Sequence, residues 1–226
     1  MTSSIKSIMN ENVLDKTVLV RADLNIPMSN GNISDQSRVE RVIPTINFLK
    51  SSGAKIVICS HLGRPNGKYN KNYTLKPLVK ILSNILGTNV RFSNSCLGQE
   101  ALDIKTSLKA GEILLLENVR FHEEEINNSL SFAKKLSEGC DLFVNDAFSC
   151  SHRAHSSLHA ITNFLPSYSG KLMDEEIKAL TSVLSSPIKP VAALVGGAKI
   201  STKINICLLY TSDAADEEDS VDLGGR

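Results

Sequence analysis

Continuous apolar stretches, rich in β-branched residues and bounded by polar ones, recur along most of the chain. In the clearest of them, Ile56, Val57 and Ile58 follow one another with no polar residue between them. A run of this kind is typical of a strand buried on both faces, as in a parallel sheet covered by helices. The pattern predicts strands over residues 16–20, 55–60, 90–92, 113–116, 142–144 and 190–195.

Amphipathic stretches separate these expected strands. Between residues 38 and 51, Val39, Val42 and Ile46 recur at the spacing that places them on one face of a helix, and Pro44 predicts a kink in it. The alternation of strands and helices predicts an α/β fold, a doubly wound parallel sheet in a Rossmann-like three-layer αβα arrangement. We expect helices over residues 38–51, 75–86, 98–108, 129–137 and 173–184.

A second α/β unit begins near the expected strand 190–195, but its pattern fades after residue 206. One strand cannot form a sheet, so we expect the second α/β domain to be truncated. The last twenty residues are acidic and poor in apolar residues, which predicts a disordered tail unrelated to the rest. The expected division is a first domain over 1–170, an interdomain helix and incomplete second domain over 171–206, and the tail over 207–226.

The charge of the chain is unevenly distributed, although the 226 residues carry a formal net charge of only +1. Residues 1–206 hold 24 basic against 18 acidic residues, a surplus of +6, while 207–226 hold one basic against six acidic residues, a balance of −5. The basic residues are dispersed, 5% of all residues are aromatic and none is Trp, so nucleic acid is a poor match. A small anionic ligand fits such a surplus better.

The sequence also bears on the compartment. No apolar stretch approaches the ~20 residues of a membrane helix, and residues 1–12 lack the apolar core of a signal peptide. The five cysteines form no CxxC pair, which agrees with a reducing compartment. We therefore expect a cytoplasmic protein that binds neither membranes nor nucleic acid.

Polar side chains gather where the expected strands end. The carboxyl ends of parallel strands lie at one edge of a sheet, and ligands bind there. Guanidinium groups bind carboxylates and phosphates through paired hydrogen bonds, so several arginines at this edge predict a site for a small dianion that carries both groups. A single arginine at a strand end would indicate no more than a surface ion pair. The residues expected at this edge are Arg21, Asp23, Asn25, Arg38, His61, Arg64, Asn118, Arg120 and Arg153.

A glycine pair marks the start of the second unit. Gly196 and Gly197 follow an expected strand, where they would let a phosphate approach the beginning of a helix. Lys199 and Lys203 are four residues apart and would share one face of that helix. A plain glycine turn before a helix remains the alternative, since the chain contains no GxxxxGK[ST] and no GxGxxG motif.

Two clusters of metal-ligating residue types are interpreted without a metal. His152, His155 and His159 match no common zinc spacing and are interpreted as a polar loop and helix face. The segment Glu123–Glu125 is interpreted as the solvated start of a helix. We predict no metal site in either cluster.

The order of these motifs resembles the phosphoglycerate kinase family over residues ~5 to ~206. Gly196-Gly-Ala-Lys199, followed by Lys203, resembles the first block of that family's nucleotide domain. From Cys207 onward the chain no longer resembles the family, which agrees with a truncated chain. The remaining matching blocks are Arg21-Ala-Asp-Leu-Asn-Ile-Pro27, Ser60-His-Leu-Gly-Arg-Pro65, Leu116-Glu-Asn-Val-Arg-Phe-His-Glu-Glu-Glu125, Phe143-Val-Asn-Asp-Ala-Phe148 and His152-Arg-Ala-His155.

The resemblance implies reversible phosphoryl transfer between 1,3-bisphosphoglycerate with Mg-ADP and 3-phosphoglycerate with ATP, in glycolysis, by a monomer. It implies that Arg38 and Lys199 are catalytic, because both would stabilise the charge of the transferring group. It implies nucleotide binding by Gly196, Gly197, Lys199 and Lys203, with the Mg²⁺ ligands in a part of the family fold beyond this chain. The residues that it implies for the 3-phosphoglycerate site are Asp23, Asn25, Arg38, His61, Arg64, Arg120 and Arg153, with Arg21 beside them.

Two other classes of protein stay open at this point. A non-catalytic α/β module that binds an anion fits the truncated chain as it stands, and a truncated kinase would retain mainly 3-phosphoglycerate binding. A nicotinamide-dependent dehydrogenase fits the fold class but requires a glycine fingerprint that the chain lacks.

Overall fold

The computed structural model describes residues 5–26, 28–29, 32–33 and 36–185. Residues 1–181 form one compact unit and residues 182–226 a second, which is described only as far as residue 185. The expected strand 190–195 and the tail therefore lie outside the described residues. The predicted divisions after residues 170 and 206 stay predictions.

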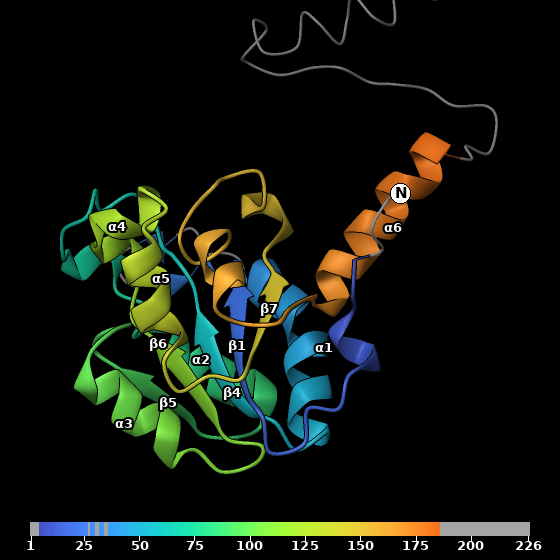
Figure 1. The fold of residues 1–226 in the computed structure, drawn as a ribbon. Coiled ribbons are helices and arrows are strands. Elements are labelled where there is room, and N and C mark those ends of the chain that lie inside the picture. Colours follow the sequence, from blue (N-terminus) through green and yellow to red (C-terminus); the bar gives the residue numbers. More distant parts are fainter. Residues whose placement is uncertain (1–4, 27, 30–31, 34–35, 186–226) are drawn as a thin grey trace, which may run out of the picture. The chain divides into compact units, whose positions relative to one another are not determined.

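A sheet of six parallel strands forms the centre of the first unit (Figure 1). The strand order is β5-β6-β4-β1-β7-β8, so the first strand of the sequence lies in the middle, between β4 and β7. Val20 pairs with Ile58 on one side and Val144 on the other. The strands are β1 (Thr17–Ala22), β4 (Lys55–Cys59), β5 (Val90–Ser93), β6 (Ile113–Leu116), β7 (Leu142–Asp146) and β8 (Ser167–Ser169), and β2 (Met28–Ser29) and β3 (Asn32–Ile33) form a separate antiparallel pair.

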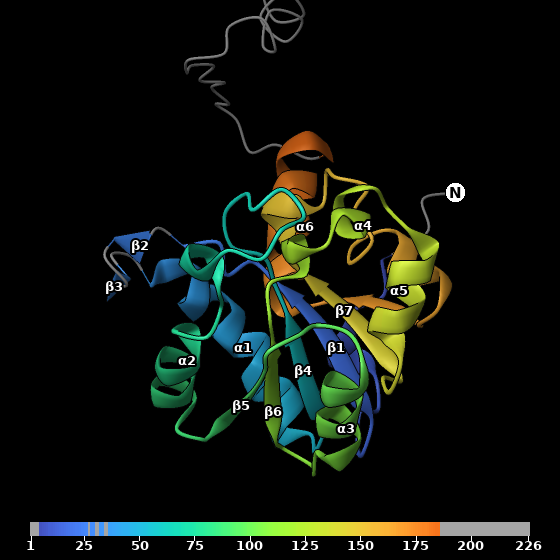
Figure 2. The same ribbon diagram turned by 90° about the vertical axis from the view of Figure 1, so that its left-hand side faces the viewer.

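Helices cover both faces of the sheet, which makes it the middle of three layers (Figure 2). On the face of α1 and α2, Ile46 and Leu82 belong to the same apolar cluster as Val20. On the face of α3 and α5, Leu136 packs with Leu19, the residue before Val20. Successive strand residues thus enter opposite cores, as a strand buried on both faces requires. The helices are α1 (Ser37–Ser51), α2 (Leu78–Leu86), α3 (Gln99–Ser107), α4 (Glu123–Ile126), α5 (Leu130–Ser137) and α6 (Lys171–Ser185).

This architecture confirms the predicted doubly wound α/β fold, with local differences. Pro44 lies inside the continuous helix α1, and the kink expected there stays a prediction. The expected helix 75–86 begins only at Leu78, and the Leu75 backbone N–H before it donates to the carboxylate of Glu117. Strand β8 was not predicted, since Ser-Tyr-Ser has no apolar pattern. It forms because β7 supplies a free strand edge beside it.

The end of β7 holds the start of α6. Asp146, the last residue of β7, accepts a hydrogen bond from the backbone N–H of Met173 at 3.0 Å. A side chain at Gly170 would collide with Asp146, because a Cβ there would lie 2.3 Å from its Oδ1. The Lys171 backbone N–H donates to Oγ1 of Thr45 on α1 at 2.9 Å. These contacts tie α6 to both β7 and α1. None of the described helices is long and apolar enough to cross a membrane.

Candidate anion-binding site

The carboxyl ends of the central strands bring most of the predicted site residues to one edge of the sheet. They occupy two neighbouring pockets. The first, here called the arginine pocket, is lined by Arg64, Arg120, Arg153 and His155, with Asn66 and Ile126 at its side, and has a volume of about 110 Å³. The second, here called the helix pocket, lies between α1 and α6 and has a volume of about 140 Å³.

Arg120 is the most enclosed cation of the arginine pocket, with 4% of its surface exposed. Its Nη1 donates to the carbonyl of Gly63 at 2.9 Å, and its backbone N–H donates to Oδ1 of Asn118. Its Nε is buried and has no hydrogen-bond partner among the described residues. Burial, then Arg153 and Arg21, lower the pKa of Arg120. A guanidinium in this state is stabilised by an anion that enters the pocket.

Asn118 fixes the loops that carry these residues. Its Nδ2 donates to the carbonyls of Leu62 and Tyr73 at 2.8 and 2.9 Å. Gly63 between them adopts a φ of +63°, and a Cβ there would lie 2.3 Å from the ring of Tyr73. The loop therefore requires glycine at this position. At this edge of the sheet, the side chain of Asn118 holds the loops under the pocket.

Arg21 lies beneath the pocket and has no exposed surface. Its Nε donates to Oγ of Ser157 at 3.0 Å, its Nη1 to the Ala22 carbonyl at 2.5 Å, and its Nη2 to Nδ1 of His61 at 2.9 Å. The sequence analysis placed Arg21 beside the anion. In this structure its guanidinium contacts the protein on all three nitrogens, because residue 21 lies inside β1 and not after it.

Glu125 departs from the expected solvated helix start. Glu123 and Glu124 are exposed, but Glu125 is fully buried. It accepts hydrogen bonds from the backbone N–H of Ser157 at 2.8 Å and from its Oγ at 2.6 Å. Burial raises the pKa of Glu125, and Arg21 and Ser157 oppose that shift. Because Glu123, Glu124 and Glu125 are identical, the sequence contains no periodicity from which the burial of Glu125 could be predicted.

The histidine segment also differs from its interpretation as a polar loop and helix face. His152 and His159 are exposed, whereas His155 is 8% exposed. Its Nδ1 lies 3.8 Å from Oε1 of Glu125. Burial and the charges of Arg120 and Arg153 lower the pKa of His155 to about 4. The segment therefore contributes one wall residue of the arginine pocket.

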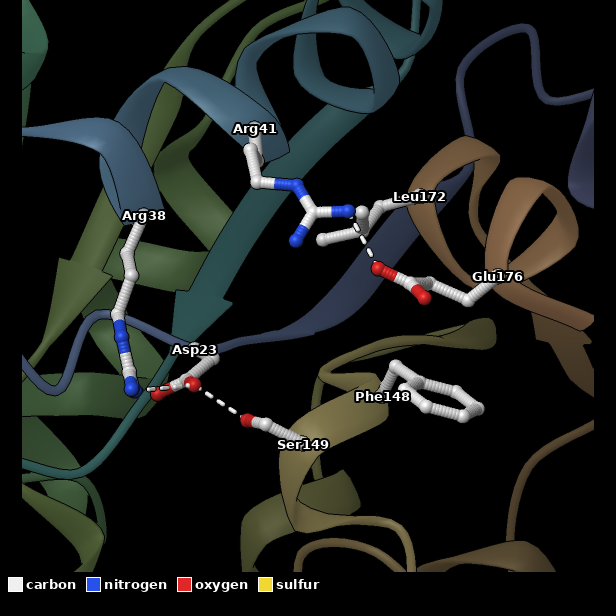
Figure 3. Close-up of a pocket in the computed structure, with 7 residues that line it drawn as sticks. All are labelled: Asp23, Arg38, Arg41, Phe148, Ser149, Leu172 and Glu176. Atoms are coloured by element: carbon white, nitrogen blue, oxygen red, sulfur yellow. Dashed lines mark hydrogen bonds and ion pairs between the residues drawn. The ribbon is translucent and has the colours of Figure 1, made fainter. Parts of the chain in front are cut away.

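The helix pocket contains Asp23, Arg38 and Arg41, together with Phe148, Ser149, Leu172 and Glu176 (Figure 3). Arg38 and Asp23 form an ion pair at 2.7 Å, and the Ser149 hydroxyl donates to the same carboxylate oxygen. Arg41 on α1 pairs with Glu176 on α6. The charges that line this pocket are therefore paired with one another.

Asn25 and His61 connect the two pockets. Asn25 Oδ1 accepts from the backbone N–H of Gly63 at 2.8 Å, and its own backbone N–H donates to Asp23. Polar side-chain atoms of Asp23, His61 and Cys150 lie within 4.8 Å of one another, the one group among the described residues close enough to share a metal ion. Burial, Arg21, Arg120 and Arg153 lower the pKa of His61. The same positive surroundings favour an anion over a metal cation.

The predicted residues thus occupy several distinct places. The structure brings Arg64, Arg120 and Arg153 together, places Asp23 with Arg38, and sets Asn25 and His61 between them. Gly196, Gly197, Lys199 and Lys203 lie outside the described residues. Sequence reasoning missed His155, Ser157 and Ser149 as parts of the site. Serine gives no signal of its own, and His155 was set aside because its spacing matched no metal motif.

The geometry agrees with comparisons to known proteins. The family model described as phosphoglycerate kinase matches residues 8–225, past the point where the motif resemblance ended. A phosphoglycerate kinase of Borrelia garinii subsp. bavariensis is 48% identical over 204 residues, 90% of this chain and 52% of that protein. One of Wolbachia pipientis subsp. Culex pipiens is 44% identical over 222 residues, 98% of this chain and 55% of that protein.

Solved structures give the same result for the fold. The crystal structure of phosphoglycerate kinase from Pyrococcus horikoshii OT3 superposes with a TM-score of 0.83 at 34% identity, over 93% of this chain and 53% of that chain. The structure of phosphoglycerate kinase from Coxiella burnetii gives a TM-score of 0.79 at 38% identity, over 90% of this chain and 51% of that one. The chain spans about half the length of the relatives that it matches.

Proposed function

The chain belongs to the phosphoglycerate kinase family, and from this premise we propose that it supplies the 3-phosphoglycerate site of a kinase. The reaction is reversible phosphoryl transfer between ATP and 3-phosphoglycerate, which gives ADP and 1,3-bisphosphoglycerate, as a cytoplasmic step of glycolysis. The observation that carries this proposal is the arginine pocket, in which three guanidinium groups converge on a space of about 110 Å³.

The two ends of the substrate differ in charge distribution, and the two pockets divide them. We assign the phosphate to Arg64, Arg120 and Arg153, since three guanidiniums suit a tetrahedral dianion. The glycerate part lies toward Asn25, His61 and Asp23, whose amide, imidazole and carboxylate groups can hydrogen-bond to its oxygens. The substrate carboxylate then faces Arg38, at the start of α1.

Phosphoryl transfer in this arrangement needs positioning more than acid–base chemistry. A carboxylate oxygen of 3-phosphoglycerate attacks the γ-phosphorus of ATP, the new C–O–P linkage forms, and the bond to the β-phosphate oxygen breaks with its electron pair leaving on ADP. The attacking carboxylate is already ionised, so no base has to remove a proton. Arg38 and Lys199 stabilise the negative charge of the transferring group, and Gly196, Gly197 and Lys203 bind the nucleotide phosphates.

Magnesium would accompany the nucleotide, where it neutralises the phosphate oxygens. Mg²⁺ prefers oxygen ligands, and the one close cluster among the described residues is Asp23, His61 and Cys150. Asp23 is engaged by Arg38 and Ser149, and the other two members offer nitrogen and sulfur. The described residues do not fit this ion.

Calorimetric titration of the chain with 3-phosphoglycerate, glycerate and inorganic phosphate tests the site. We expect 3-phosphoglycerate to bind most tightly, with affinity falling as salt rises. Arg64→Ala and Arg153→Ala should each weaken binding by about 1.5–3 kcal/mol. Arg91→Ala, on β5 outside both pockets, is the matched control. Equal affinity in the wild type and both pocket variants would overturn the assignment.

A non-catalytic anion-binding module would give the same titration, so catalysis needs its own measurement. A coupled assay with Mg-ATP and 3-phosphoglycerate should detect ADP formation when the family's remaining half is present in the same polypeptide. Binding without turnover in that longer protein would favour the module. Gel filtration with light scattering tests the expected monomer.

A further inference from the structure

A continuous chain of hydrogen bonds runs under the arginine pocket from Glu125 to His61. Glu125 binds the Ser157 hydroxyl at 2.6 Å, that hydroxyl binds Nε of Arg21 at 3.0 Å, and Nη2 of Arg21 binds Nδ1 of His61 at 2.9 Å. All four side chains are buried. Glu125, Ser157 and Arg21 stand in separate elements, namely α4, the segment before η5 (Ala160–Asn163), and β1.

The chemistry of each group determines the direction of each bond. A guanidinium has donors and no acceptor, so Nδ1 of His61 must accept from Arg21. Nε of Arg21 can only donate, so it binds a lone pair of the Ser157 hydroxyl, and the single proton of that hydroxyl points to Glu125. A neutral imidazole that accepts at Nδ1 carries its proton at Nε2. Nε2 has no hydrogen-bond partner among the described residues.

We propose that Glu125, acting through Ser157 and Arg21, is a positioning residue that holds His61 as its Nε2–H tautomer. His61 then meets the substrate as a neutral hydrogen-bond donor, aimed at an oxygen of the glycerate part. The inference rests on the proposed function for the identity of that ligand, but not for the tautomer. It gives the buried carboxylate of Glu125, which the transfer chemistry does not use, a role in the site.

The charges around His61 support a neutral ring. Protonation at Nδ1 would remove the acceptor that Arg21 requires and would add a cation beside cations. Arg21 approaches from β1, Arg120 from η3 (Val119–Phe121), and Arg153 with His155 from the segment after η4 (Phe148–Cys150). Asp23 and Cys150 are the other titratable groups near the ring, and Asp23 is already paired with Arg38. A neutral donor can therefore persist across the physiological pH range.

Ser157→Ala breaks the chain of hydrogen bonds without changing any charge. Ser156→Ala is its matched control, because the Ser156 hydroxyl is also enclosed but donates to the carbonyls of Glu124 and Ser129, outside the chain. The protein is labelled with ¹⁵N in its histidines, and the Nδ1 and Nε2 resonances of His61 are assigned by their loss in His61→Asn. The measurement is made on the ligand-free chain between about pH 5 and 8.

In the wild type and Ser156→Ala we expect an unprotonated Nδ1, a protonated Nε2 and no titration of His61. In Ser157→Ala we expect a mixture of tautomers and a protonation step within the range. The affinity for 3-phosphoglycerate should fall about tenfold near neutral pH, equal to 1.4 kcal/mol. It should recover partly as pH falls, because His61 then gains positive charge. The second ionisation of the ligand's phosphate affects all variants alike.

A purely structural role for Ser157 would lower the free energy of unfolding and leave the tautomer unchanged, and that result would overturn the proposal. A second variant, Arg21→Met, must release the tautomer as well. If Arg21→Met does not fold, the Ser157→Ala spectrum still decides. Failure of 3-phosphoglycerate to bind the wild type would refute the proposed function but not the tautomer, since the spectra are recorded without ligand.

Discussion

The arginine pocket and the helix pocket lie at the same edge of the sheet but hold their cations in opposite ways. In the arginine pocket, Arg120 is 4% exposed, and its Nε has no partner among the described residues. In the helix pocket, Arg38 and Arg41 have side chains that are 46% and 57% exposed, and each is paired with a carboxylate. The arginines of one pocket form no ion pair among the described residues, whereas the other pocket holds balanced charge between two helices.

The difference has a consequence for binding and chemistry. An anion that enters the arginine pocket meets Arg120, which is already desolvated, beside the more exposed Arg64 and Arg153, so the pocket can supply most of the affinity. An anion that reaches Arg38 must compete with Asp23, so part of the gain is offset by the pair that it breaks. A group whose negative charge develops during the reaction competes with Asp23 for Arg38 better than a group that is already charged in the ground state. Under the proposed function, the helix pocket would therefore face the transferring group and the arginine pocket the bound phosphate.

The largest expected effect is on the free energy of unfolding and comes from Asp146, which holds the start of α6 beside the helix pocket. Burial raises the pKa of Asp146 from 3.8 to about 6. A raised pKa in the folded state means stability that is present below pH 4 and is lost as pH rises through 6. The loss amounts to at most about 3 kcal/mol. Urea unfolding between pH 4 and 8 should show this decline in the wild type and not in Asp146→Asn, which keeps an oxygen for the Met173 N–H.

Parallel stability curves for the two proteins would contradict the shift. If 3-phosphoglycerate binding weakens over the same pH range as the free energy of unfolding falls, the two pockets are not independent of each other. That result would show that the arginine pocket depends on the position of α6.

The second effect separates affinity from stability in the arginine pocket. Arg120→Met should weaken 3-phosphoglycerate binding by about 2 kcal/mol, roughly 30-fold, because a buried charged donor is lost. Its free energy of unfolding should stay the same or rise, since a desolvated cation is replaced by an apolar chain. Calorimetry and urea unfolding measure the two quantities. A variant that binds normally, or that unfolds more easily than Arg91→Met, would contradict the account of a preorganised anion site.

These pockets also show how far the sequence could be interpreted. The sheet was predictable because its strands are continuous apolar runs, and the edge followed from the rule for parallel strands. Arg21 was expected in a loop because the first strand was expected to end at residue 20, whereas β1 continues to Ala22. A shift of two residues moved this side chain from the loop into the sheet, where Arg21 pairs in register with Asn145 of β7.

The buried partners could not be found from the sequence for a different reason. Glu125 is buried because Ser157, 32 residues away, offers it two donors. Such pairing depends on the tertiary fold, and neither residue has a local pattern that announces it. The separation into two pockets has the same origin, since contacts with residues far away in the sequence, such as Asp146 and Thr45, hold α6 at this edge.

A smaller effect is expected from Arg38. Arg38→Met should weaken 3-phosphoglycerate binding by about 1 kcal/mol, because the exposed guanidinium is screened and already shared with Asp23. In the longer protein the same change should lower kcat far more than it raises KM, as expected for a group that acts on developing charge. Calorimetry and steady-state kinetics together test this. A binding loss as large as that of Arg120→Met would remove the distinction between the pockets.

The smallest effect is expected from the pair of Arg41 and Glu176, which joins α1 to α6 across the helix pocket. Both groups are solvent-accessible, so a double-mutant cycle with Arg41→Met and Glu176→Gln should give a coupling of about 0.2–1 kcal/mol that fades at high salt. Because Glu176 neutralises a cation at the pocket, Glu176→Gln should free that charge and tighten 3-phosphoglycerate binding by about twofold at low salt, equal to ~0.4 kcal/mol.

Removing a carboxylate from the arginine pocket's own network, as in Glu125→Gln, should instead weaken 3-phosphoglycerate binding, since that carboxylate orients buried donors. If the helix pocket is balanced in charge and the arginine pocket is preorganised, these two glutamate substitutions must change the affinity for 3-phosphoglycerate in opposite directions. The same sign in both would mean that net charge alone governs the edge of the sheet.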